Sequence, residues 1–221
     1  MKIIDKLYVY PWLSYQENNC NTIFIEGTKP LMIDPGHRHL FHHIAEGMSK
    51  DGKSIEQVKC ILCTHSHPDH IEAISYFNNK ILTGISEQEY EYLNNDGREL
   101  FLTTGCTVPD NPFRLFLKDG IAMIGDITLQ IIRTPGHSPG SICLYWEEKK
   151  VLISGDTVFY MGVGRTDFQG GNMNALGNSI EMLSKLNVEY LIPGHGEILK
   201  GEKEVKRNFK LIMEEFFSRH L

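Results

Sequence analysis

Four side chains that bind metal ions lie close together in the segment THSHPDH, residues 64–70: His65, His67, Asp69 and His70. Imidazole nitrogens and carboxylate oxygens are ligands for zinc and other divalent metals of the first transition row. A single His-x-His pair is usually a surface feature, whereas His-x-His-x-Asp-His after an apolar run is far more specific. The segment therefore predicts a metal site.

The flanking residues predict how this segment is positioned. The apolar run VKCILCT, residues 58–64, is typical of a strand, and side-chain alternation would place His65 and His67 on the same side of its extended end. Pro68 suits the first turn of a helix, so Asp69 and His70 are expected at the N-terminus of that helix. A strand end and a helix start would then direct all four donors into one small volume.

Three further candidate ligands follow tight turns elsewhere in the chain: His137 after TPG, Asp156 after SG and His195 after IPG. We expect all three at strand ends, where loops gather functional residues in sheet proteins. One zinc ion takes about three or four protein ligands, so the candidates together are enough for two ions, particularly if a carboxylate bridges them. Two-metal sites hold their ions about 3.5–4 Å apart and share a nucleophilic hydroxide.

Strands and helices alternate along the chain in the hydrophobic pattern. Short apolar runs bounded by Gly and Pro predict buried strands, within residues 21–27, 30–37, 58–67, 127–137, 141–146, 150–156 and 188–195. Apolar residues at helical spacing predict amphipathic helices within residues 38–50, 172–186 and 202–219. The least regular part, 84–120, is expected to start as a helix, continue as a loop and overhang the site. This order predicts an α/β chain forming one domain, residues 1–221.

The cysteines give little support for a second functional site. All five are dispersed and odd in number, which is typical of reduced thiols rather than of a disulfide framework. Cys60 and Cys63 form a C-x-x-C motif, but inside an apolar run, where residues three apart point to opposite faces of a strand. We interpret them as buried strand cysteines, with a metal or redox site as the alternative.

The histidine-rich stretch HRHLFHH, residues 37–43, is interpreted as unrelated to the metal site. Its first residue, His37, follows Pro-Gly as His137 and His195 do, but Pro-Gly-His alone describes any turn that contains a histidine. His39, His42 and His43 are expected on the polar face of an amphipathic helix, exposed to solvent.

Composition and charge exclude several classes of protein. Hydrophobic residues make up 41% and charged residues 23%, which indicates a soluble globular protein. A formal net charge of −6 argues against a general nucleic-acid binder. No window approaches the run of about 18 apolar residues that a membrane helix needs, and the N-terminus lacks the features of a secretory signal. We expect a cytoplasmic protein, monomeric or homodimeric, that acts on a small molecule and binds neither nucleic acid nor membrane.

Four motifs in this order, THSHPDH, TPGHSPGS, SGDTVF and IPGHG, resemble the metallo-β-lactamase-fold superfamily. The resemblance covers roughly residues 20–197 and is specific through the motifs jointly. It implies a four-layer αββα sandwich of two mixed sheets flanked by helices, with the metals at the edge of the two sheets.

The resemblance also implies a role for each candidate ligand. His65, His67 and His137 would hold the first metal ion, and Asp69, His70 and His195 the second. Asp156 would bridge the two ions. Asp34, in IDPG, matches a position whose carboxylate usually supports the ligands from behind. The cofactors expected are two divalent ions, zinc first, with iron or manganese as alternatives.

Within this superfamily the chain is most similar to single-domain members of the glyoxalase II, or hydroxyacylglutathione hydrolase, branch. The loop GDTVFYMGVGRTDFQGG, residues 155–171, carries this similarity and also resembles the loop of persulfide dioxygenases, which hold one iron. Arg165 and Tyr160 in this loop are candidate substrate-binding residues. The alternative for Arg165 is a structural ion pair with Asp167 that orders the glycine-rich loop.

Two features depart from the family pattern. Full-length glyoxalase II has a helical C-terminal domain that helps to bind glutathione, whereas only about one helix is expected after His195. The family usually has glycine shortly after the Asp-His pair, where this chain has Glu72 and Ala73. Glu72 is expected in the first turn of a helix beside the metals, either solvated or in contact with groups that support the ligands.

The leading hypothesis is metal-assisted hydrolysis of a thioester or related acyl compound, with Asp69 as the catalytic residue that holds or accepts the proton of the attacking water. A thiolate leaving group needs little protonation, which suits a site without an obvious general acid. The first alternative is a mononuclear iron persulfide dioxygenase, in which His65, His137 and Asp156 form a two-His-one-carboxylate triad. A lactonase of the same fold and a binding protein that keeps an inactive site are the remaining alternatives.

Overall fold

Two mixed β-sheets form the centre of the protein in a computed structural model that describes residues 1–14, 16–77, 81–110 and 113–217. The first sheet has the strand order β1-β2-β3-β4-β5-β6-β7. Its strands are β1 (Lys2–Ile4), β2 (Leu7–Tyr10), β3 (Thr22–Ile25), β4 (Leu31–Ile33), β5 (Cys60–Leu62), β6 (Leu82–Ser86) and β7 (Leu115–Leu117). Pairing is antiparallel from β1 to β4 and parallel from β4 to β7.

The second sheet has the order β15-β14-β11-β10-β9-β8. Its strands are β8 (Gly120–Ile124), β9 (Ile127–Arg133), β10 (Ile142–Trp146), β11 (Val151–Gly155), β14 (Tyr190–Pro193) and β15 (Leu199–Lys200). Only β11 and β14 pair in parallel within this sheet. A separate hairpin, β12 (Val158–Phe159) with β13 (Gly162–Val163), projects from the end of β11.

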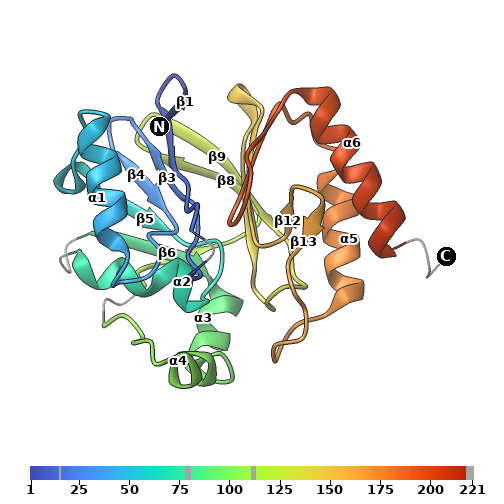
Figure 1. Ribbon diagram of the computed structural model, residues 1–221, viewed down its shortest axis with the longest axis horizontal. Helices are drawn as coiled ribbons and strands as arrows, with labels where there is room; N and C mark the ends of the chain where they lie inside the picture. Colours follow the sequence, from blue (N-terminus) through green and yellow to red (C-terminus); the bar gives the residue numbers. More distant parts are fainter. Residues whose placement is uncertain (15, 78–80, 111–112, 218–221) are drawn as a thin grey trace.

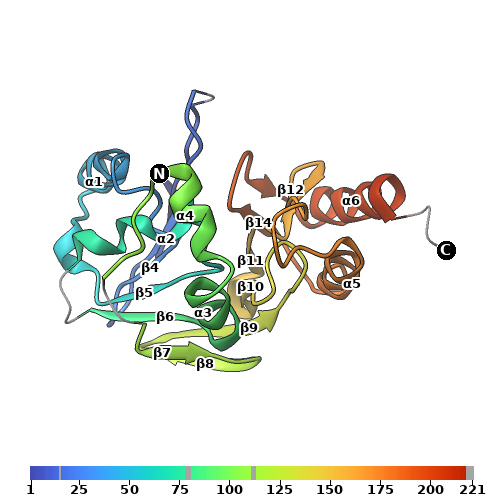
Figure 2. The same ribbon diagram turned by 90° about the horizontal axis from the view of Figure 1, so that it is seen from below.

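Helices cover the outer face of each sheet (Figures 1 and 2). Beside the first sheet lie α1 (Phe41–Lys50), α2 (Pro68–Ile71), α3 (Glu87–Asn94) and α4 (Arg98–Thr104), and beside the second lie α5 (Met173–Leu183) and α6 (Glu202–Ile212). Short 3-10 turns cover Ile55–Gln57, Glu72–Tyr76 and Glu147–Lys149, and a π-turn, Met213–Phe217, extends α6. The expected αββα sandwich is confirmed.

Three apolar layers hold the sandwich together, because the two faces of each strand bury alternate residues. One layer lies between the sheets and includes Val9, Ile33 and Leu144. The other two lie between a sheet and its helices, as Ile44 shows for the first sheet and Ile180 for the second. The helical stripes expected from the sequence supply these outer layers.

The C-x-x-C motif illustrates the alternation. Cys60 packs in the layer between the sheets, and Cys63 packs on the opposite side, beneath the helices. Both are almost completely buried, and every cysteine is a free thiol. The interpretation as buried cysteines on opposite faces is confirmed.

The expected elements differ from the structure mainly in their ends. The strands are shorter than the apolar runs that predicted them, because each run also contains the turn that follows its strand. The helix expected within 202–219 is α-helical to Ile212 and continues as the π-turn Met213–Phe217. Positions 218 and 219 of the expected helix lie outside the described residues. The segment 84–120 is more regular than expected, since α3, α4 and β7 occupy much of it. Among the described residues, no helix is long and apolar enough to cross a membrane.

Candidate metal centre

The segment THSHPDH follows the end of β5 and is held there by Asp34, which follows the neighbouring strand β4. Asp34 Oδ1 accepts a hydrogen bond from Thr64 N at 2.8 Å, and Oδ2 accepts one from Thr64 Oγ1 at 2.6 Å. The same Oδ2 lies 2.9 Å from His70 Nδ1. His67 caps α2, which begins at Pro68 as expected. Asp34 is 1% exposed, so its carboxylate fixes the whole segment from beneath.

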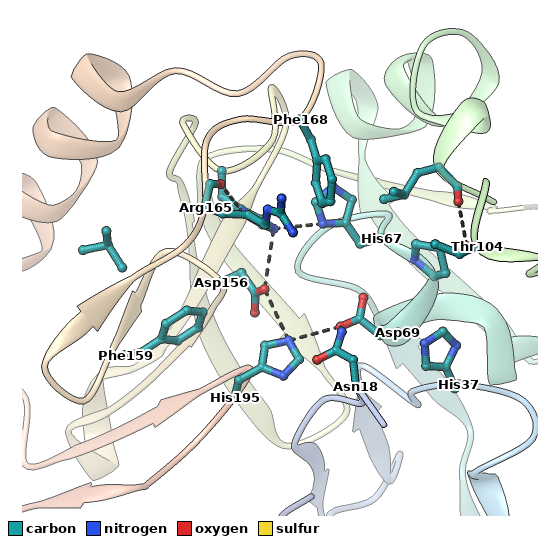
Figure 3. A pocket seen from close by; sticks show the side chains of 14 residues that line it. Asn18, His37, His67, Asp69, Thr104, Asp156, Phe159, Arg165, Phe168 and His195 are labelled. Atoms are coloured by element: carbon teal, nitrogen blue, oxygen red, sulfur yellow. Dashed lines mark hydrogen bonds and ion pairs between the residues drawn. The ribbon is translucent and has the colours of Figure 1, made fainter. Parts of the chain in front are cut away.

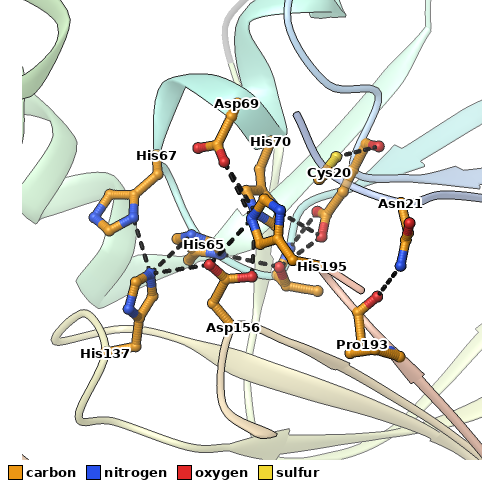
Figure 4. A network of polar contacts seen from close by, with 12 residues as sticks. Cys20, Asn21, His65, His67, Asp69, His70, His137, Asp156, Pro193 and His195 are labelled. Atoms are coloured by element: carbon orange, nitrogen blue, oxygen red, sulfur yellow. Dashed lines mark hydrogen bonds and ion pairs between the residues drawn. The ribbon is translucent and has the colours of Figure 1, made fainter. Parts of the chain in front are cut away.

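Three histidines converge at the end of this segment (Figure 4). His137 Nε2 lies 3.3 Å from His65 Nε2 and 2.9 Å from His67 Nδ1. His137 follows β9, and its outer nitrogen, Nδ1, donates to the main-chain oxygen of Arg165 at 2.7 Å. That bond leaves the lone pair of Nε2 directed at the other two rings, which is the orientation that a metal ligand needs.

A second group lies beside the first and contains Asp69, His70 and His195. His195 follows β14, and its Nε2 lies 3.1 Å from Asp69 Oδ2 and 3.3 Å from His70 Nε2. Because Asp34 engages Nδ1 of His70, the Nε2 atom of that ring is the one available to a ligand.

Asp156 lies between the two groups (Figure 4). Its Oδ2 atom is 3.5 Å from His137 Nε2 of the first group and 3.4 Å from His195 Nε2 of the second. Asp156 follows β11, where Gly155 adopts a φ of 48°, a left-handed conformation that favours glycine. The structure thus brings together all seven candidate ligands at neighbouring strand ends.

Burial and neighbouring charges set the protonation states of these groups. Burial lowers the pKa of His65 and His67, the latter to about 3, so both rings are neutral. Burial opposes ionisation of Asp69 and Asp156, but nearby imidazoles outweigh it and hold the pKa of both carboxyls low. Burial likewise opposes protonation of His195, but the same carboxylates raise its pKa to about 10. Without a metal ion, the carboxylates also raise the pKa of His70, so His70 and His195 hold protons that a cation would displace, whereas His65 and His67 are already neutral.

An unpaired buried oxygen atom also indicates that these side chains suit a metal cluster. Among the described residues, the buried atom Asp156 Oδ1 has no hydrogen-bond partner, although His70 Nε2 lies only 3.3 Å away. Lone pairs of several imidazoles and carboxylates face one another at such distances when they surround a cation. Within the described chain, three overlapping groups of His and Asp bring their ligand atoms within 4.8 Å of one another: His65–His67–His137, His65–His70–Asp156 and Asp69–His70–His195.

One residue behind the first group was missed by the sequence analysis. Glu89, in α3, is completely buried. Its Oε1 accepts bonds from Ser66 N and Oγ at 2.9 and 2.8 Å, and its Oε2 accepts bonds from Ser138 Oγ and Gly140 N at 2.7 and 2.8 Å. Ser66 separates two of the histidines and Ser138 follows the third, so one carboxylate ties both loops together. The only sequence signal was a capping pattern, Ser86 followed by Glu89.

A cavity of about 540 Å³ opens over this centre (Figure 3), and five of the seven candidate ligands line it: His67, Asp69, His137, Asp156 and His195. Its lining includes the aromatic rings of Phe159 and Phe168, and Leu100 and Thr104 of α4. The segment expected to overhang the site therefore contributes to its wall. Asn18, also missed by the sequence analysis, lines the cavity and donates from Nδ2 to Asp69 Oδ2 at 2.6 Å.

The two candidate substrate-binding residues are placed differently. Arg165 lines the cavity, lies 3.9 Å over the ring of Phe168 and forms a double hydrogen bond with Asp167. The expected ion pair is therefore present, and the side chain is also at the cavity. Tyr160 is 46% exposed and is not among the residues that line the cavity, where its neighbour Phe159 lies instead.

The interpretation of His37 as unrelated to the site is not supported, because its side chain is 12% exposed and lines the cavity. Of the two alternatives for Glu72, the solvated acid is wrong: Glu72 is 7% exposed, directly after α2, with Oε2 3.0 Å from His37 Nδ1. The turn before α1 folds back against α2, because Gly36 N bonds to His70 O and Ala73 N bonds to Gly36 O. His39 and His42 are exposed as expected, whereas His43 is partly buried, with Nε2 3.0 Å from the main-chain oxygen of Pro11.

Comparison with known proteins agrees with this geometry. The family model of the metallo-beta-lactamase superfamily matches residues 15–195. A probable metallo-hydrolase of Methanocaldococcus jannaschii is 36% identical over 188 residues, 80% of this chain and 88% of its own. A hydroxyacylglutathione hydrolase of Haemophilus influenzae is 30% identical over 211 residues, 90% of this chain and 95% of its own.

A solved structure agrees on the fold. The crystal structure of a metallo-beta-lactamase family protein from Thermus thermophilus superposes with a TM-score of 0.81 at 21% identity. The superposition covers 99% of this chain and 81% of the other.

Proposed function

The chain belongs to the metallo-beta-lactamase superfamily, and on this premise we propose that it is a metal-dependent hydrolase of a thioester or related acyl compound. The observation that carries the proposal is the position of Asp156, whose Oδ2 lies 3.5 Å from one histidine group and 3.4 Å from the other. A carboxylate shared in this way suits two ions better than one.

In the proposed site, His65, His67 and His137 would hold one divalent ion, Asp69, His70 and His195 would hold the other, and Asp156 would be shared between them. We propose zinc, with iron or manganese as alternatives. When bound, two such ions lower the pKa of a water molecule so that hydroxide exists near neutral pH, and they polarise an acyl carbonyl.

The protein's own groups complete the reaction. Asp69 takes and holds the water proton, and Asn18, which donates to its Oδ2 at 2.6 Å, fixes the orientation of that carboxylate. The hydroxide oxygen forms a bond to the acyl carbon, and the bond from that carbon to sulfur then breaks. The electron pair leaves with the thiolate, which needs no proton from the protein. Phe159 and Phe168 provide apolar walls for the acyl or thiol part of the substrate.

The relative in Haemophilus influenzae supports a thioester of glutathione as the first substrate to test. Arg165 at the cavity is a candidate contact for a carboxylate of such a thiol. A lactone remains an alternative, because an ester carbonyl suits the same chemistry, but the exposed position of Tyr160 gives that alternative no added support.

The test combines metal content with a substrate panel. The purified protein is loaded with zinc or with iron, and hydrolysis of a hydroxyacyl thioester of glutathione, a second thioester and a lactone is measured. Oxygen uptake is followed with glutathione persulfide. Thioester cleavage that needs a second equivalent of metal supports the proposal. A single bound iron with oxygen uptake and no thioester cleavage would replace the hydrolase by a persulfide dioxygenase.

A further inference from the structure

A second group of metal-ligating side chains lies near the seven donors and reaches the same cavity through His37. It consists of His37 and His39 before α1, Glu72 at the end of α2, and Cys106 after α4. Ligand atoms of His37, His39 and Glu72 all lie within 4.8 Å of one another. Cys106 Sγ lies 3.8 Å from His37 Nδ1. Three separate segments of the chain therefore converge here.

The carboxylate of Glu72 is held in place by main-chain donors. Arg38 N donates to Oε2 at 3.1 Å, and Thr107 N donates to Oε1 at 2.9 Å. Ligating carboxylates are commonly oriented by such bonds, and each oxygen keeps a further lone pair. The ring of His37 is also restrained, since its own main-chain N donates to Asn19 Oδ1 at 2.8 Å.

Glu72 is a buried carboxylate that lacks a strongly basic partner. Among the described residues, its one ion-pair contact is the imidazole of His37, which carries charge only when it is protonated. The guanidinium of neighbouring Arg38 instead lies 5.8 Å from the ring centre of Tyr76. A buried carboxylate is most stable beside a permanent cation or a metal ion. Glu17, 3.5 Å from His39 Nε2, adds negative charge near the same place.

The donor types match zinc. Tetrahedral bonds of about 2.0–2.3 Å put neighbouring ligand atoms about 3.3–3.6 Å apart. The separation of Glu72 Oε2 and His37 Nδ1 is 3.0 Å and that of His37 Nδ1 and Cys106 Sγ is 3.8 Å. Cys106 lies outside the group of three whose ligand atoms are all within 4.8 Å of one another, so its side chain would have to turn toward Glu72 and His39. Gly105, with a φ of 71°, ends α4 in the left-handed conformation that turns Cys106 back toward this group.

We propose that His37, His39, Glu72 and Cys106 form an additional zinc site at the cavity wall, separate from the seven-ligand centre. On binding, the Cys106 thiol loses its proton to solvent as the zinc–sulfur bond forms. Because the thiol must lose its proton to bind zinc, zinc affinity should increase with pH. The ion would fasten the segments 37–39 and 105–107 to α2 and so fix one wall of the cavity.

Cobalt substitution gives the sharpest test, because the seven-ligand centre contains no sulfur. Metal-free protein is titrated with cobalt(II), and the near-ultraviolet band of a cobalt–thiolate bond is recorded. Bound zinc is counted separately after gel filtration. The wild type should show the thiolate band and should hold one more zinc per chain than Cys106→Ser and His39→Ala. His42→Ala is the matched control, since His42 is an exposed histidine of the same stretch.

A wild-type protein without the thiolate band, or with the zinc content of Cys106→Ser, would overturn the proposal. A band that persists in His39→Ala with unchanged zinc content would overturn the assignment of His39. Thioester hydrolysis measured on the same samples keeps the two proposals apart, because the seven-ligand centre is intact in Cys106→Ser. Loss of the band in a variant that still hydrolyses substrate supports the additional site.

Discussion

Replacing Glu89 by glutamine should weaken both the fold and the binding of metal by the first histidine group. The amide oxygen can still accept from Ser66 N and Oγ, as Oε1 of the glutamate does at 2.9 and 2.8 Å. The amide nitrogen then faces Ser138 Oγ and Gly140 N, which lie 2.7 and 2.8 Å from Oε2. The Ser138 hydroxyl can rotate to accept a bond, whereas the Gly140 N–H cannot. One buried donor therefore loses its acceptor.

The expected loss of stability follows from that single mismatch. A hydrogen bond to a charged group contributes about 1.5–3 kcal/mol, and leaving a buried donor unpaired costs about 1–3 kcal/mol. These contributions overlap, so we expect Glu89→Gln to lower the free energy of unfolding by about 2–4 kcal/mol. Because the two loops tied by Glu89 carry His65, His67 and His137, zinc affinity should also fall, by about 10–100-fold as for other groups that orient ligands.

Urea unfolding of the metal-free protein measures the first effect, and competition with a chromophoric chelator measures the second. Glu91→Gln is the control, since Glu91 is an exposed glutamate in the same helix and its replacement should change stability by less than about 0.5 kcal/mol. If Glu89→Gln matches this control in unfolding and in zinc affinity, Glu89 does not position the loops. A loss of stability with unchanged zinc affinity would limit its role to the fold.

Three further predictions concern the centre, the core and the rim of the cavity. His67→Ala should lower the rate of thioester hydrolysis by more than about 100-fold, because loss of a ligand costs more than the about 10–100-fold lost with a group that only orients a ligand. The circular dichroism spectrum should be unchanged, and full turnover would refute metal catalysis. Burial raises the pKa of Cys60 to about 11 from 9.0. Because the folded protein holds the thiol proton more tightly than the unfolded chain does, this group stabilises the fold fully below pH 9, and the stabilisation is lost as the pH rises to about 11. In urea unfolding under reducing conditions, the free energy of unfolding of Cys60→Ala should therefore fall less between about pH 9 and 11 than that of the wild type, by up to about 2–3 kcal/mol. The same pH dependence in both proteins would contradict this effect of burial. Arg165→Ala should raise KM up to about fivefold, which corresponds to the loss of one exposed charge contact of about 1 kcal/mol. Asp167→Asn should leave KM nearly unchanged. Equal effects of the two substitutions would indicate a structural ion pair instead.

The positions of the candidate ligands were predictable because each is tied to a local signal. His137, Asp156 and His195 follow apolar runs that end in a glycine turn, and the structure has β9, β11 and β14 ending before these residues. The strand expected before THSHPDH and the helix beginning at Pro68 are both present. Parallel and neighbouring strands then bring such ends to one edge of a sandwich. The local sequence pattern and the geometry of the fold are therefore sufficient to predict where these candidate ligands lie.

Some of the strands were not predictable in the same way. The strands β1, β6 and β8 were not expected, and their sequences KII, LTGIS and GIAMI contain no alternation of polar and apolar residues long enough to stand out. The residues of β8 are largely exposed, so pairing with β9 and not burial defines that strand. The strands that pair with β6, β5 and β7, lie far along the chain, whereas β1 and β8 pair with the next strand in a hairpin whose short, irregular sequence does not mark it.

Buried acids mark the limit of sequence patterns at this site. Glu89 lies in EQEYEYLN between two other glutamates, and Glu72 lies in DHIEAI, so both look like the polar side of an amphipathic helix. Each is buried because loops from distant segments supply its hydrogen-bond donors: Gly140 and Ser138 for Glu89, Arg38 and Thr107 for Glu72. A carboxylate becomes stable in the interior only when such donors surround it. Long-range contacts therefore decide which glutamates support the candidate metal sites.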